Sequence, residues 1–86
     1  MPRLSFFYGI AIYLYYKEHP PPHIHAIYGE HEAKVSITTG AVTEGTLPGR
    51  AARLVAEWVT EHADELAECW EKAAQGEPPG TIEPLR

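Results

Sequence analysis

The chain divides into two halves that differ in the spacing and type of their hydrophobic residues. Residues 5–46 are rich in β-branched and aromatic side chains and are interrupted by Gly and Pro. This pattern is typical of short strands joined by turns. Residues 48–75 are instead rich in Ala, Glu and Leu, without a proline after Pro48 or a glycine after Gly49. The second half therefore favours helix.

Four strands are expected in the first half. The stretch 10–16 is apolar at both odd and even positions, which is typical of a strand covered on both faces. Gly29-Glu30 fits a two-residue hairpin turn, and Gly40 fits a second turn further along. The prolines at 20–22 predict an extended connection. The predicted strands, at 10–16, 23–28, 31–37 and 41–45, form an antiparallel meander.

Apolar residues in the second half recur at a spacing close to the 3.6 residues of an α-helix. A helical segment over 48–75 is predicted, and Gly76 and Pro78 end it. As one rod it would be about 42 Å long, against roughly 23 Å for a seven-residue strand. It is therefore one long helix that projects beyond the sheet, or it kinks near 60–63. Its apolar stripe consists of Ala51, Leu54, Val55, Trp58, Val59, Leu66, Cys69, Trp70 and Ala73.

These patterns predict an α+β fold in which the helical segment packs on one face of the meander.

The composition of the chain narrows the class of protein further. The 86 residues suffice for a single domain over 1–86, and the lone Cys69 excludes an intrachain disulfide. The formal charge of −5 argues against a protein that binds nucleic acid by charge alone. We find no apolar run of about 20 residues and no signal peptide, so we expect a cytoplasmic protein without membrane contact.

The turn at Gly29-Glu30 determines which residues face each other across the flanking strands. Ile24 then faces Val35 and Ala26 faces Ala33, and these apolar pairs define the core side of the sheet. The opposite side carries His23, His25, Ile27, Glu32, Lys34 and Ser36, with Tyr13 and Tyr15 added if the first strand pairs in phase. This polar side is the strongest chemical signal in the chain.

One interpretation of the polar side is general acid–base catalysis by His23, His25 and Lys34. Histidine titrates near neutral pH, so two imidazoles can divide proton abstraction and proton donation between them. The Lys34 ammonium can stabilise a developing anion. Cleavage of RNA without a metal needs such a set, and tyrosines can stack on bases.

A second interpretation is a divalent metal site. His23 and His25 alternate along one strand, so they project the same way and offer two ligands. Glu32, diagonal to His25, is the expected third ligand. His31 has the opposite parity, and an extended proline-rich connection would place His19 roughly 12 Å away.

A third interpretation is that the polar side binds another protein. His, Tyr, Lys and Ser are ordinary residues of an interface, and tyrosine is enriched there. Ile27 would lie at the centre of such a surface.

Several blocks of sequence occur together in this chain. They are Phe6-Phe7-Tyr8-Gly9-Ile10, Pro21-Pro22-His23-Ile24-His25-Ala26 with Tyr28-Gly29, Glu44-Gly45-Thr46-Leu47-Pro48 followed by Arg53-Leu54-Val55 and Glu57-Trp58, and near the end Trp70 and Ile82-Glu83-Pro84-Leu85. In combination, over almost the full length, they resemble the bacterial "domain of unknown function 4160" family of small cytoplasmic proteins.

The resemblance implies a gene beside that of a second small protein, in an arrangement like a toxin–antitoxin pair, and assigns no catalytic residues. We therefore expect a toxin-like component that binds the small neighbouring protein, or a second copy of itself, and cleaves RNA through the His/Lys/Tyr side. The alternative is a non-enzymatic, regulatory module that binds a protein partner, a metal or a small ligand. Beyond a divalent metal, no cofactor is expected.

Overall fold

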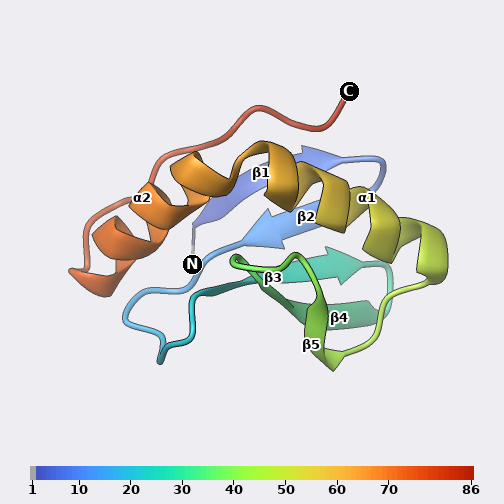
Figure 1. Ribbon diagram of the computed structural model, residues 1–86, viewed down its shortest axis with the longest axis horizontal. Helices are drawn as coiled ribbons and strands as arrows, with labels where there is room; N and C mark the ends of the chain where they lie inside the picture. The colour runs from blue at the N-terminus through green and yellow to red at the C-terminus, as the bar shows by residue number, and fades with distance from the viewer. Residues whose placement is uncertain (1) are drawn as a thin grey trace.

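Five strands form one antiparallel sheet, which confirms the predicted α+β meander. In the computed structural model, the strands follow one another in sequence order across the sheet (Figure 1). The structure describes residues 2–86, so Met1 of the expected domain lies outside the described residues. The strands are β1 (Arg3–Phe7), β2 (Ile10–Tyr13), β3 (His23–Tyr28), β4 (His31–Ser36) and β5 (Val42–Gly45).

Strand β1 is the element that the sequence analysis missed. Tyr8 and Gly9 join it to β2 as a two-residue turn in which both residues have positive φ, 50° and 80°. Such a turn matches the twist of an antiparallel hairpin. The predicted strand 10–16 is also too long, because pairing ends at Tyr13 and the chain then leaves the sheet. The ends of the other three strands are within one residue of the prediction.

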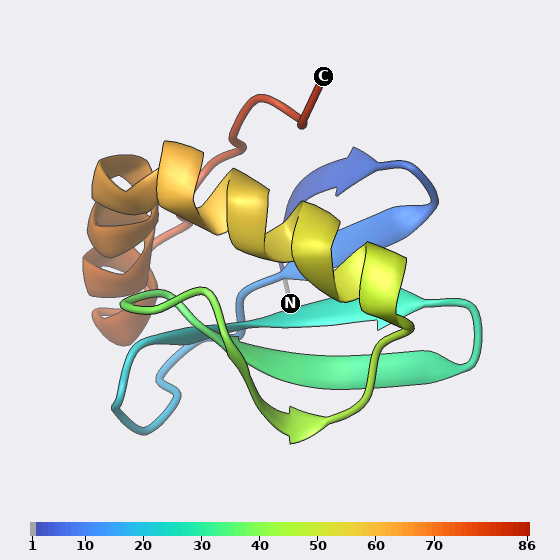
Figure 2. The ribbon, with the colours of Figure 1, turned by 45° about the vertical axis from the view of Figure 1, so that its right-hand side comes forward.

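Two helices, α1 (Gly49–Glu61) and α2 (Ala63–Ala74), replace one long helix. They meet at His62, whose φ of −115° and ψ of 28° interrupt the helical backbone. The kinked alternative is therefore confirmed and the single rod is wrong. Helix α1 lies across one face of the sheet, while α2 turns away and lies at one end of it (Figure 2). Among residues 2–86, neither helix is long and apolar enough to cross a lipid bilayer.

Trp58 lies at the centre of the core between α1 and the sheet. Its side chain is fully buried, and its ring is 5.4 Å from that of Phe7 on β1. The indole Nε1 donates a hydrogen bond of 2.8 Å to the carbonyl of Glu83 in the C-terminal tail. The amide of Ile82 donates to the carbonyl of Leu4, so the tail also covers the edge of β1. One residue thus connects helix, sheet and tail.

Replacing Trp58 with Ala should destabilise the protein by about 3–5 kcal/mol, because a large buried ring and its hydrogen bond are lost. Urea unfolding followed by circular dichroism measures this. The matched control is Glu57→Ala, a change at the exposed neighbouring position of α1, which should alter the free energy of unfolding by less than about 0.5 kcal/mol. A loss below about 1 kcal/mol for Trp58→Ala would contradict the central place of this residue.

Candidate metal centre

The predicted register between β3 and β4 is confirmed. His25 faces Lys34 and His23 faces Ser36. Tyr13 of β2 pairs with His25 from the other side. The two histidines therefore lie on the side of the sheet opposite to the apolar pairs that contact α1.

The polar side of the sheet, although opposite the face that packs on α1, is covered at the end where the histidines lie. Only 7% of His23 and 5% of His25 is exposed. The ring of Tyr15, from the chain that follows β2, stacks on His25 with ring centroids 4.0 Å apart. Trp70 of α2 lies against His23, with ring centroids 5.3 Å apart. The turn at His62 places α2 at this end of the sheet, so the imidazoles are enclosed.

The connection between β2 and β3 brings a further residue, Glu18, to the two imidazoles. The amide of Lys17 donates to the carbonyl of Ala73, which anchors the connection to the end of α2. The chain therefore folds back over β3 and does not run straight into it. His19, on the same connection, lines the same groove as His23.

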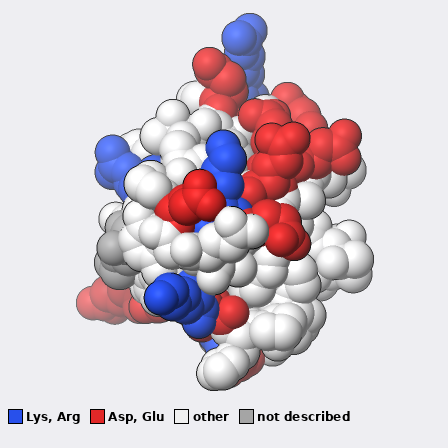
Figure 3. All heavy atoms as spheres, turned by 90° about the vertical axis from the view of Figure 1, so that its left-hand side faces the viewer, with Lys and Arg blue, Asp and Glu red and all other residues white. Residues whose placement is uncertain are grey.

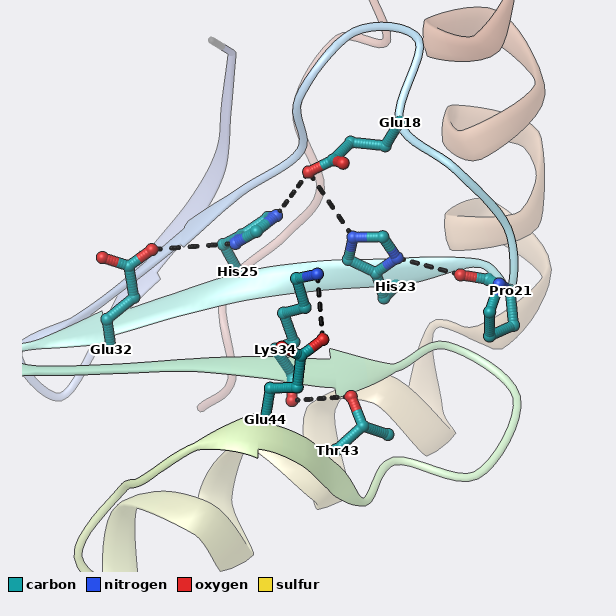
Figure 4. Close-up of polar contacts among 8 residues, drawn as sticks. All are labelled: Glu18, Pro21, His23, His25, Glu32, Lys34, Thr43 and Glu44. Atoms are coloured by element: carbon teal, nitrogen blue, oxygen red, sulfur yellow. Dashed lines mark hydrogen bonds and ion pairs between the residues drawn. The ribbon is translucent and has the colours of Figure 1, made fainter.

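Both imidazoles point one nitrogen at the same carboxylate oxygen (Figure 4). Glu18 Oε1 lies 2.8 Å from His25 Nε2 and 3.5 Å from His23 Nε2. One oxygen or nitrogen atom from each of these three residues lies within 4.8 Å of the other two. The three residues thus converge on a volume the size of a single ion.

The opposite nitrogen of each imidazole faces an oxygen acceptor. His23 Nδ1 lies 2.9 Å from the carbonyl oxygen of Pro21, and His25 Nδ1 lies 3.7 Å from Glu32 Oε2. A carbonyl oxygen can only accept, so the hydrogen is on His23 Nδ1. The Nε2 atom of a neutral His23 then carries a lone pair, and among the described residues this buried atom has no hydrogen-bond partner. Metal-binding histidines are held in this way by acceptors at their outer nitrogen.

Glu32, the expected third ligand, does not join this convergence. Its carboxylate lies on the Nδ1 side of His25, and the carboxylate that converges with the two imidazoles is that of Glu18. Reasoning from strand parity missed Glu18, since a loop residue has no parity that would place it on either side of the sheet.

The charges around the imidazoles are unbalanced. Lys34 forms an ion pair of 3.0 Å with Glu44 of β5. When the imidazoles are neutral, the net formal charge of the site is −2, from the three carboxylates of Glu18, Glu32 and Glu44 and the one ammonium of Lys34.

Near the same site, burial raises the pKa of Tyr15, and the negative charges of Glu32 and Glu18 raise it further. Tyr15 therefore stays a neutral phenol and adds no charge.

The pKa of Glu18 responds to two opposing effects. Burial alone raises it, but the hydrogen bond with His25 and the positive charges that His23 and His25 carry when protonated together outweigh burial. The pKa therefore lies below the ordinary value for glutamate. Glu18 is consequently a carboxylate at neutral pH, in the form that a metal ion requires.

Two imidazole nitrogens and one carboxylate oxygen form a donor set known from metal enzymes. It is the His₂Glu set of some catalytic zinc sites and the facial set of non-haem iron sites. Three protein ligands leave at least one coordination position for water or another ligand. His23 and Glu18 also line a groove with a volume of about 390 Å³.

The sequence model of the family described as "Domain of unknown function (DUF4160)" matches residues 9–71. The chain belongs to this family. The predicted resemblance is thereby confirmed, and Glu18, His23 and His25 all lie within the matched segment. Comparisons with curated proteins and with solved structures gave no match.

In metal-free protein with neutral imidazoles, we expect the hydrogen of His23 on Nδ1 and that of His25 on Nε2. The carbonyl of Pro21 accepts the first, and the carboxylate of Glu18 accepts the second. Long-range ¹H–¹⁵N correlation spectra distinguish the two tautomers, with exposed His31 as the internal control. A hydrogen on Nε2 of His23 would contradict the assignment, because that atom would then have no free lone pair.

Proposed function

We propose that this protein binds a divalent transition-metal ion through Glu18 Oε1, His23 Nε2 and His25 Nε2. The observation that carries the proposal is the convergence of these three atoms, with an oxygen acceptor behind each imidazole. The ion would keep open coordination positions, as in metal sites that bind or activate a further ligand.

The distances between the donor atoms suit a small ion. Bonds of about 2.0–2.1 Å in tetrahedral geometry separate two ligand atoms by about 3.3 Å. His23 Nε2 and Glu18 Oε1 are already 3.5 Å apart, and His25 Nε2 and Glu18 Oε1 need to separate slightly from 2.8 Å. Mixed nitrogen and oxygen donors favour zinc, iron, cobalt or nickel over calcium and magnesium, which prefer oxygen alone.

A divalent ion also resolves two local imbalances. It brings the net formal charge of Glu18, Glu32, Glu44 and Lys34 from −2 to zero. It also occupies the lone pair of His23 Nε2, and a buried acceptor without a partner is otherwise costly. With the ion bound, His25 would carry its hydrogen on Nδ1 instead of Nε2, and Glu32 Oε2, now 3.7 Å from Nδ1, would accept it after a small approach.

Zinc or cobalt at 100 times the dissociation constant should stabilise the wild-type protein by about 2.7 kcal/mol. For a domain of this size, the melting temperature should rise by about 10–20 °C. Calorimetric titration should give one ion per chain, and Glu18→Gln and His25→Ala should each weaken binding by at least tenfold.

The matched controls are Glu30→Gln and His31→Ala, which change the same residue types at exposed positions of the β3–β4 hairpin. Both should bind the ion as the wild-type protein does. A melting temperature that does not move in excess metal, or an equal shift in Glu18→Gln and wild type, would overturn the proposal.

A toxin-like role, in which His23, His25 and Lys34 cleave RNA without a metal, stays a prediction. The two imidazole rings are adjacent, with centroids 5.2 Å apart, which suits acid–base chemistry. However, Lys34 is already paired with Glu44, and the nearby carboxylates repel a phosphodiester backbone. Helix α2 adds exposed acids at the same end of the molecule, where Figure 3 shows acidic side chains gathered in the upper part. The exposed acidic residues of α2 are Asp64, Glu65, Glu68 and Glu71.

The toxin-like role predicts that expression of the wild-type protein slows the growth of a bacterial host and degrades its RNA. The variant His23→Ala/His25→Ala should do neither. Co-purification with the product of the neighbouring gene tests whether a small protein is the partner, with a second copy of this chain as the alternative. Equal growth and intact RNA in both strains would remove the nuclease hypothesis. The cytoplasmic location likewise stays a prediction.

A further inference from the structure

We infer that the open side of the metal site takes a small oxyanion, a phosphate or carboxylate group, which bridges the metal ion and the ammonium of Lys34. The inference rests on the proposed function, because the metal ion supplies one of the two positive charges. It goes beyond that function by naming the chemical class of the ligand and the residues that select it.

The groove beside the imidazoles has room for such a ligand. Its volume of about 390 Å³ lies within the range of small-molecule sites. Glu18 and His23 line one wall, and Lys34 and Ser36 of β4 line another. A ligand in the groove can therefore reach Glu18 and His23, two of the three proposed metal donors, and β4 at once.

Lys34 is placed to hold the second oxygen of the ligand. It faces His25 in the register of the sheet, and in Figure 4 its side chain extends from β4 toward the two imidazoles. Its partner Glu44 is 68% exposed, and an ion pair so open to water is weak. An oxyanion that is also bound to a metal ion can therefore compete with Glu44 for the ammonium.

Ser36 supplies a further donor on the same wall. Its Oγ accepts hydrogen bonds from the amides of Thr38 and Thr39, at 3.1 and 3.2 Å. Both bonds use lone pairs of the oxygen, so the hydroxyl hydrogen remains available to donate into the groove. Because Ser36 faces His23 across the strands and both residues line the groove, this donor is within the same groove as His23.

The arrangement favours a single small group over an extended polyanion. One tetrahedral or planar group with two oxygens can contact the metal ion and Lys34 together. A longer chain of phosphates would also meet further carboxylates, because Glu44 lines the same groove and Glu32 lies on the Nδ1 side of His25. The ligand is therefore a compact anion that carries its charge on one centre.

Cobalt-loaded protein allows a direct test, because the visible absorption bands of cobalt change when a ligand enters its coordination shell. Sodium phosphate and sodium acetate are titrated separately into protein that holds one equivalent of cobalt. We expect saturable spectral changes with at least one of the two anions. The identity of the anion that binds shows whether the ligand is a phosphate or a carboxylate.

Variants then identify the second contact. Lys34→Gln should weaken anion binding at least tenfold and leave cobalt affinity unchanged or tighter, since it removes a positive charge near the ion. Ser36→Ala should weaken anion binding by a smaller factor. Lys72→Gln, at an exposed lysine of α2, is the matched control and should bind anions as the wild type does.

The outcomes separate the two proposals. If cobalt binds but neither anion changes its spectrum, or if Lys34→Gln binds anions as tightly as wild type, this inference is wrong and the metal site stands. If no cobalt spectrum develops in the wild-type protein, both are wrong.

Discussion

The packing of α1 on one face of the sheet determines where the polar residues of this protein can lie. Trp58 and the residues around it cover the face that carries Ile24 and Val35. Side chains alternate along a strand, so the residues directly before and after Ile24 and Val35 must project to the opposite face. His23 and His25 lie on that face because their neighbours along β3 pack in the core, and two of the three proposed metal donors follow from this constraint.

The second helix and the β2–β3 connection convert an open polar face into an enclosed site. The backbone interruption at His62 lets α2 turn to the end of the sheet, where Trp70 contacts His23. The connection is held to α2 through Lys17, and it carries Tyr15 and Glu18 over the imidazoles. Enclosure lowers the local dielectric and strengthens the attraction between the carboxylate and a bound cation.

Interpretation of the site depends on the nitrogen that each histidine presents. A pair of buried imidazoles is by itself equally compatible with acid–base catalysis, metal binding or plain packing. Here each outer nitrogen faces an acceptor, and both inner nitrogens face one carboxylate oxygen. This polarity favours metal binding. In this arrangement Glu32 would accept a hydrogen bond from the outer nitrogen of His25 and would not bind the metal ion itself.

The sequence by itself determined the features that arise from local periodicity. The turn at Gly29-Glu30 and strand alternation placed His23, His25 and Lys34 on one side, and the helical stripe marked Trp58 as core. Only the tertiary structure decided the position of Glu18, because the path of its loop depends on a backbone contact with α2 far along the chain. The burial of the imidazoles depends on the same packing. Strand β1 was missed although the turn at Tyr8 and Gly9 is local, since a non-glycine residue with positive φ is seldom evident from sequence.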